Sequence, residues 1–124
     1  MVYNKDGLYK KEYWSLQTKP HTDNFDETCE KIKFLIKDSV ERQLVSDVPL
    51  CTLLSGGLDS SIITAIASNY YRKKYGKRLK TFSVDYVGQQ ENFVKNDFQP
   101  DTDDKYIDLM VKTFDTDHTK IVLD

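Results

Sequence analysis

Apolar residues recur at steps of three and four between residues 25 and 44, which is the period of one face of a helix. Acidic side chains at Asp26 and Glu27 suit a first helical turn, and any residue from 22 to 24 can cap it. The pattern predicts a helix that packs against one face of the domain. Its apolar stripe consists of Phe25, Cys29, Ile32, Ile36, Val40 and Leu44.

After Pro49, short apolar runs alternate with helical stripes. Residues 50–54, 79–84 and 120–123 are predicted as strands, and residues 60–75 and 103–114 as helices, with Asp103 and Gly76 as caps. This alternation predicts an α/β fold with a parallel sheet, half of a doubly wound nucleotide-binding domain. The helical residues expected to face inward are Ile62, Ile63, Ile66, Ala67 and Tyr70, then Tyr106, Ile107, Met110, Val111 and Phe114.

The two remaining stretches are less regular. Residues 2–16 suggest a short hairpin with residues 4–7 as its turn, and residues 17–24, which include Pro20, suggest a linker. Residues 86–101 form a polar loop longer than most connections, which favours a functional role or mobility.

Composition excludes several classes of function. The net charge of −2 gives no reason to expect a nucleic-acid partner, and no apolar run approaches the ~20 residues that span a bilayer. The first eleven residues lack the apolar core of a signal peptide. Cys29 and Cys51 lie in apolar patterns without metal-site spacing, so we expect reduced core cysteines in a cytoplasmic protein.

The loop between the first predicted strand and the next helix carries the chemistry. Gly56 and Gly57 have no Cβ, so the backbone can take positive φ angles and approach an anion closely. Hydroxyls and free helical N–H groups attract phosphate, and Asp59 beside a phosphate implies an intervening Mg²⁺. The hydroxyl groups come from Ser55, Ser60 and Ser61.

Each of these sequence features also has a simpler structural interpretation. The loop lacks a Walker A lysine, a dinucleotide fingerprint and a nucleophile elbow, and two glycines alone would be an ordinary strand-to-helix turn. For the basic cluster of residues 72–78, a favourable helix end is preferred over a nucleic-acid face. For Asp101, Asp103 and Asp104, helix capping is preferred over a metal site, and His118 is expected in a surface turn.

The run from Ser55 to Ser61 resembles the pyrophosphate loop of the N-type ATP pyrophosphatases, an adenine nucleotide alpha hydrolase-like group. With residues 47–49 and Leu53-Leu54 before it, the segment resembles glutamine-hydrolysing asparagine synthetases. Residues 13–14, 82–86 and 96–100 agree with that family, so the resemblance covers nearly the whole chain.

The resemblance implies an enzyme that adenylates the side-chain carboxylate of aspartate, releases pyrophosphate and amidates the product with glutamine-derived ammonia. Asp59 would ligate Mg²⁺, while Leu53 or Leu54 would contact the nucleoside and Val84 the adenine, unless Val84 is an ordinary strand residue. The full set expected to bind ATP is Leu53, Leu54, Ser55, Gly56, Gly57, Leu58, Asp59, Ser60, Ser61 and Val84.

Two family features are missing, the glutaminase cysteine at the amino terminus and a second motif on the fourth strand. Residues 1–20 are therefore expected to end a glutaminase domain, and residues 21–124 to begin a synthetase domain truncated after its third strand. No complete catalytic set is expected, so the chain alone should be inactive and should self-associate. Two alternatives stay open: another carboxylate-adenylating enzyme such as a β-lactam synthetase, or a nucleotide-binding module without catalysis.

Overall fold

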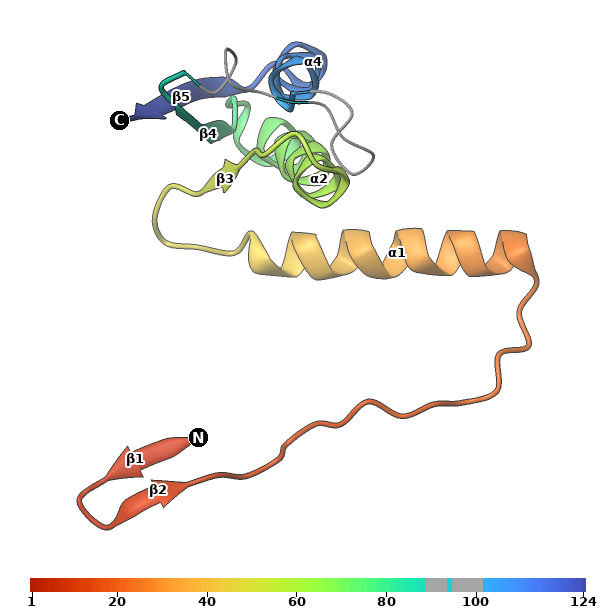
Figure 1. The fold of residues 1–124 in the computed structure, drawn as a ribbon. Helices are drawn as coiled ribbons and strands as arrows, with labels where there is room; N and C mark the ends of the chain where they lie inside the picture. The colour runs from red at the N-terminus through yellow and green to blue at the C-terminus, as the bar shows by residue number, and fades with distance from the viewer. Residues whose placement is uncertain (89–93, 95–101) are drawn as a thin grey trace.

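The computed structural model describes residues 1–88, 94 and 102–124, in which helices and strands alternate after an amino-terminal hairpin (Figure 1). The elements in chain order are β1 (Val2–Asn4), β2 (Gly7–Tyr9), α1 (Phe25–Gln43), β3 (Cys51–Leu53), α2 (Leu58–Tyr75), β4 (Lys80–Tyr86), α4 (Asp104–Phe114) and β5 (Asp117–Leu123). The long loop expected at residues 86–101 lies largely outside the described residues.

The sheet has three parallel strands in the order β3-β4-β5, joined by α2 and then by the crossover that contains α4. Leu53 pairs with Phe82, and Val84 pairs with Ile121. This arrangement confirms the α/β class and the partial doubly wound topology. Within the described residues β3 is an edge strand.

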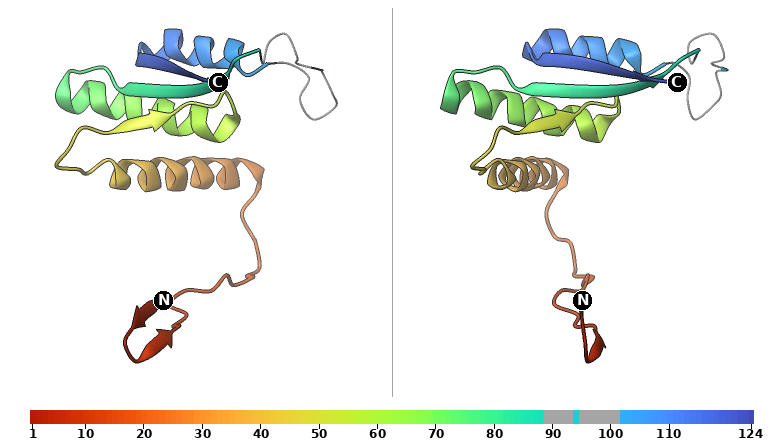
Figure 2. Two further views of the ribbon diagram at one scale, coloured as in Figure 1. Left: turned by 60° about the vertical axis from the view of Figure 1, so that its left-hand side comes forward. Right: turned by 90° about the vertical axis from the view of Figure 1, so that its left-hand side faces the viewer.

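Both α2 and α4 lie on one face of the sheet. Thr52 of β3 is hydrogen-bonded to Thr64 of α2 at 3.0 Å, and Lys120 of β5 donates to Asp104 of α4 at 2.9 Å. The opposite face has no described helix packed on it (Figure 2). Leu53, Val84 and Ile121 are 72%, 52% and 41% exposed. Val84 therefore lies on an open face of the sheet and is not an ordinary buried strand residue.

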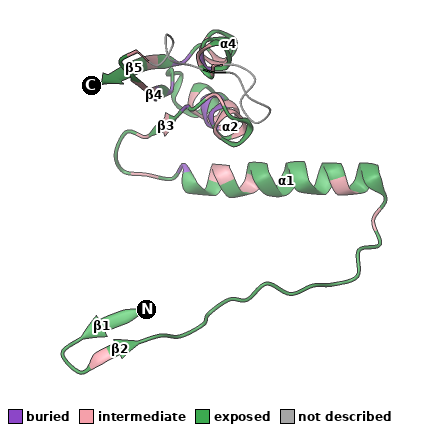
Figure 3. Ribbon diagram, viewed as in Figure 1, coloured by how far each residue is buried: buried purple, intermediate pink, exposed green. Residues whose placement is uncertain are grey.

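Helix α1 begins with the expected cap. The Asn24 side chain accepts from the Glu27 N–H, and Glu27 accepts from the Asn24 N–H, which completes a capping box. The carboxyl end of α1 packs on α2 through a small core of Leu44, Ala67 and Leu79. The predicted stripe is only partly correct, because Phe25 and Ile32 remain 81% and 51% exposed (Figure 3).

The buried face of α2 matches the predicted one only in part, at Ala67. Thr64, Ala67 and Ser68 are buried, whereas Ile62 and Ile63 line a hollow beside α1. Small side chains let the helix approach the sheet closely, and Thr64 gains a hydrogen-bond partner there. In α4 the buried residue is Ile107, one of the five expected.

The amino-terminal segment is shorter in structure than predicted. The strands end at Tyr9, the Asn4–Gly7 turn is as expected, and residues 10–22 form an exposed, extended linker. Neither cysteine is a core residue: Cys29 and Cys51 are both free and exposed. In the part of the chain that the structure describes, no helix has the length and apolarity to cross a bilayer.

Candidate functional site

The loop from Ser55 to Gly57 turns sharply between β3 and α2. Gly56 has φ +82°, a conformation that glycine adopts without steric cost. A Cβ on Gly56 would lie 2.8 Å from the carbonyl oxygen of Asp103, so the loop passes directly against the start of α4. Gly57 has φ −73° and needs no glycine for its backbone conformation. Of the two glycines, which both allow a positive φ, only Gly56 adopts one.

Serine hydroxyls hold the loop in shape. Ser60 Oγ donates to the Gly57 carbonyl at 3.1 Å and accepts from the Ser55 N–H at 3.3 Å. The Ser55 and Ser60 hydroxyls lie 3.0 Å apart. Two of the three predicted phosphate-binding hydroxyls are therefore brought together, and they face one another at the start of α2.

Helix α2 begins without a side-chain cap. Its N-cap is Gly57, which has no side chain to accept hydrogen bonds from the first helical N–H groups. Asp59 in the first turn is exposed, and its carboxylate forms no hydrogen bond or ion pair with the described residues. The start of α2 thus offers open N–H donors and one unengaged carboxylate, which suits an anion accompanied by a cation.

A cavity of about 290 Å³ lies beside this loop, between the carboxyl ends of β3 and β4 and the start of α4. It contains four of the predicted nucleotide-binding residues: Leu53, Leu54, Ser55 and Val84. The other predicted residues, at positions 56–61, lie outside its lining, and Leu58 is 75% exposed. The predicted set therefore divides into a loop at the start of α2 and a cavity at the sheet edge.

The cavity also has an acidic side that the sequence analysis missed as part of a site. Asp85, Asp103 and Asp104 line it, together with Phe82, Ser83, Thr102 and Ile107. Carboxyl ends of strands and the loops after them are where ligands bind in such folds, and this rule pointed to positions 85 and 102–104. Asp103 is the N-cap of α4 as expected, but its side chain makes no capping hydrogen bond.

A lysine from β5 ties two of these carboxylates together. Lys120 Nζ lies 2.6 Å from Asp85 Oδ2 and 2.9 Å from Asp104 Oδ1. The Lys120 ammonium and the Tyr86 N–H hold the pKa of Asp85 below its ordinary value. The two carboxylates in turn raise the pKa of Lys120.

His118 lies in β5 and not in the surface turn that was predicted. Its Nδ1 is 2.9 Å from Thr81 Oγ1 and its Nε2 is 3.1 Å from Ser83 Oγ, so both ring nitrogens are engaged with β4. Burial lowers the pKa of His118. The side chain therefore has a structural role between two strands.

The basic cluster at the end of α2 also binds neighbouring backbone. Arg72 donates to the Phe114 carbonyl at 2.9 Å, and Arg78 donates to the Thr116 carbonyl at 2.6 Å. Both arginines form ion pairs with Asp115. These contacts join α2 to the turn between α4 and β5, which accounts for the two arginines without a nucleic-acid ligand.

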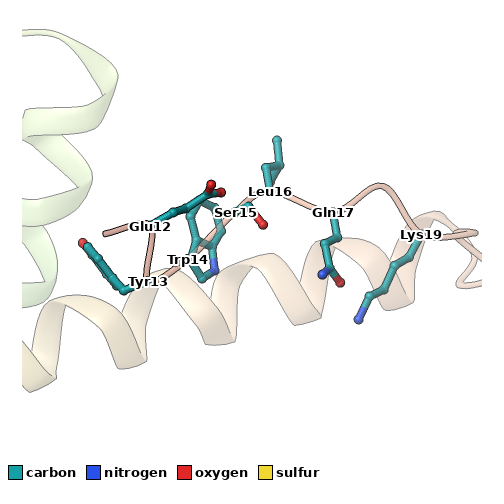
Figure 4. Close-up of a pocket in the computed structure, with 7 residues that line it drawn as sticks. All are labelled: Glu12, Tyr13, Trp14, Ser15, Leu16, Gln17 and Lys19. Atoms are coloured by element: carbon teal, nitrogen blue, oxygen red, sulfur yellow. The ribbon is translucent and has the colours of Figure 1, made fainter. Parts of the chain in front are cut away.

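A hollow of about 810 Å³ lies along the linker (Figure 4). Its lining consists of Glu12–Gln17 and Lys19, all from a single exposed, extended segment. Because a single irregular segment forms all of its walls, no second element fixes the shape of this hollow. The smaller cavity, with walls from β3, β4 and α4, is the better candidate site.

A magnesium ion at Asp59 is compatible with the residues present but has limited protein support. Within residues 1–88, 94 and 102–124, no three His, Cys, Asp or Glu side chains gather as a metal cluster. Mg²⁺ commonly takes one or two carboxylates and completes its shell with phosphate oxygens and water. Asp59 supplies one such ligand, so Mg²⁺ stays a prediction that depends on bound phosphate.

Known proteins resemble this chain along nearly its whole length. The asparagine synthetase 3 of Bacillus subtilis strain 168, a glutamine-hydrolysing enzyme, is 46% identical over 99% of this chain and 20% of its own length. The asparagine synthetase 1 of the same organism is 36% identical over 74% of this chain and 13% of its own. Asparagine synthetase B of Escherichia coli K12 is 37% identical over 59% of this chain and 13% of its own length.

The chain spans about a fifth of the length of the B. subtilis enzyme that it matches at 46% identity. The family model described as asparagine synthase matches residues 31–124, which include the loop, the cavity and all three parallel strands. The chain therefore belongs to the asparagine synthase family.

Proposed function

We propose that this chain is the ATP-binding part of an asparagine synthetase. The triphosphate binds at the start of α2, against the loop from Ser55 to Ser61, and the nucleoside enters the cavity that Leu53, Leu54 and Val84 line. The observation that carries this assignment is the uncapped start of α2 directly beside a cavity at the carboxyl edge of a parallel sheet.

Electrostatics favour this orientation of the nucleotide. The charged residues lining the cavity are Asp85, Asp103 and Asp104, so a phosphate placed inside it would be repelled. The N-terminal end of α2 has the opposite polarity, because the helix dipole and free N–H groups attract anions. Mg²⁺ bound to Asp59 and phosphate oxygens would neutralise charge there.

We further propose the reaction that the resemblance to asparagine synthetases implies. ATP activates the side-chain carboxylate of aspartate by adenylation, pyrophosphate leaves, and ammonia from glutamine displaces AMP. In that scheme the residues of this chain position the nucleotide and stabilise the charge on pyrophosphate. We also propose that residues 1–20 end a glutaminase domain and that residues 21–124 begin the synthetase domain. The exposed linker and the family match from residue 31 support this division.

Calorimetric titration with magnesium pyrophosphate tests the phosphate site. We expect binding that Asp59→Asn weakens by at least about tenfold, since a charge-assisted ligand interaction is worth roughly 1.5–3 kcal/mol. Asp26→Asn is the matched control, because Asp26 is an exposed acid in the first turn of α1. Equal binding by the Asp59→Asn variant and the unaltered chain would remove Asp59 from the site.

A second variant tests the role of the backbone N–H groups at the start of α2. Gly57→Ala is compatible with the free fold, because φ is −73° and the new Cβ would meet Ser55 Oγ at an ordinary 3.5 Å. We expect this variant to fold as the unaltered chain does and to lose affinity for pyrophosphate, because the methyl group blocks close approach to the helical N–H groups.

A further inference from the structure

Asp85 is an acidic residue of the cavity that the surrounding structure holds firmly. Its side chain is 14% exposed, Oδ2 lies 2.6 Å from Lys120 Nζ, and Oδ1 accepts from the Tyr86 N–H at 2.8 Å. A carboxylate offers about four lone-pair sites. Two are occupied here, so the fixed carboxylate retains capacity to accept from a ligand in the cavity.

The arrangement around Asp85 does not suit a cation. The ammonium group of Lys120 already lies between Asp85 and Asp104, where a metal ion would have to bind. A second positive charge beside it would be repelled. With that position taken by the ammonium, the acceptor capacity left on Asp85 favours a neutral group that donates hydrogen bonds.

The part of ATP that meets this description is the nucleoside. Adenine carries an exocyclic amine, and ribose carries hydroxyl groups, both neutral donors. Leu54 and Ile107 line the same cavity and supply apolar surface for a flat base. The Asp85 carboxylate thus suits a hydrogen-bond donor of the nucleoside, and the apolar residues suit the face of its base.

We propose that Asp85 is a specificity-determining residue for the nucleoside, accepting a hydrogen bond from the amine of adenine or a ribose hydroxyl. This inference rests on the proposed function, because it assumes that the nucleoside occupies the cavity. Lys120 acts on the ligand through Asp85: it fixes the carboxylate and keeps it ionised, so it is a positioning residue.

Nucleotide analogues test the proposal without altering the protein. Inosine triphosphate lacks the exocyclic amine, and 2′-deoxyATP lacks one ribose hydroxyl. We expect the chain to bind MgATP at least about tenfold more tightly than one of these two analogues, because a lost bond to a charged acceptor has that effect. The analogue that binds more weakly identifies the donor. Equal affinity for all three nucleotides would overturn the role of Asp85.

The variant Asp85→Ala tests the same contact from the protein side. We expect it to lose the preference for ATP while retaining pyrophosphate binding, since Lys120 stays paired with Asp104. Asp117→Ala is the matched control, at an exposed position of β5 outside the cavity lining. A variant that keeps the full preference would refute the proposal. Absence of pyrophosphate binding in the unaltered chain would instead refute the phosphate site itself.

Discussion

Gly56 shows how a single residue connects the loop to the rest of the site. Its positive φ and its distance to Asp103 both exclude a side chain, so the loop is fitted to the start of α4. The two adjacent glycines therefore serve different purposes. Gly56 is required by the fold, whereas Gly57 leaves the start of α2 open.

Gly56→Ala should destabilise the chain. The added methyl group would lie 2.8–2.9 Å from Asp103 atoms, in a backbone region that alanine disfavours. Overpacking of this kind costs about 1–3 kcal/mol, and the strained φ adds to it. Urea denaturation of the variant, with Gly57→Ala as the control, measures the difference. Equal stability of the two variants would show that the loop does not press against α4.

At this scale the sequence predicted part of the site. The identities of Ser55, Gly56 and Gly57 pointed to a phosphate because their chemistry and order are local, whereas Val84 came from the family resemblance alone. The acidic side was missed because it depends on distant pairing. Lys120 contacts Asp85 and Asp104, which lie 35 and 16 positions away along the chain. No periodic pattern in a single sequence reports such contacts.

Among the helices and strands, ends were predicted better than buried faces. The caps at Asn24 and Gly76 follow local rules, and both are confirmed. The inward face of α2 was predicted only in part, because the prediction ranked residues by hydrophobicity: it included Ala67 and missed Thr64 and Ser68. All three buried residues are small enough for close packing against the sheet. The elements that pack against a helix decide which of its faces is buried. The apolar pattern of the helix alone does not identify those elements.

His118 of β5, which bonds to Thr81 and Ser83 of β4, predicts that the stability of the chain depends on pH. Burial lowers the pKa of His118, so the folded state binds a proton less readily than the unfolded state. The resulting stability is present above the unfolded pKa, near 6.5, and is lost as pH falls. Asp108 of α4 opposes this shift and Lys120 reinforces it, so both belong to the environment of the imidazole.

Urea denaturation at pH 7.5 and 5.5 measures this effect. We expect the free energy of unfolding to fall more for the unaltered chain than for His118→Gln, since glutamine still bonds to hydroxyls but does not titrate. His21→Gln is the control for the other histidine, which lies in the exposed amino-terminal segment. An identical fall in the His118→Gln variant would assign the pH dependence to other groups.

For the whole molecule, the distribution of apolar surface is uneven. Helices α2 and α4 cover one face of the sheet, while Leu53, Val84 and Ile121 remain exposed on the other. The edge strand β3 carries Cys51, Thr52 and Leu53, none of them charged. Native edges are usually protected by charge, proline or a covering element. Within the described residues, this edge has none of these protections.

These features predict that the chain self-associates. Burial of one large aliphatic side chain is worth about 1.5–3 kcal/mol, and the net charge of −2 provides little repulsion between copies. Sedimentation velocity over a concentration range, with reductant to exclude disulfides, should show oligomers. Cys51→Lys should shift the distribution toward monomer, because a charge on the edge opposes strand pairing, whereas Val2→Lys in the hairpin should not. A chain that stays monomeric at every concentration and melts cooperatively would mean that this face and edge are stable in water without a partner.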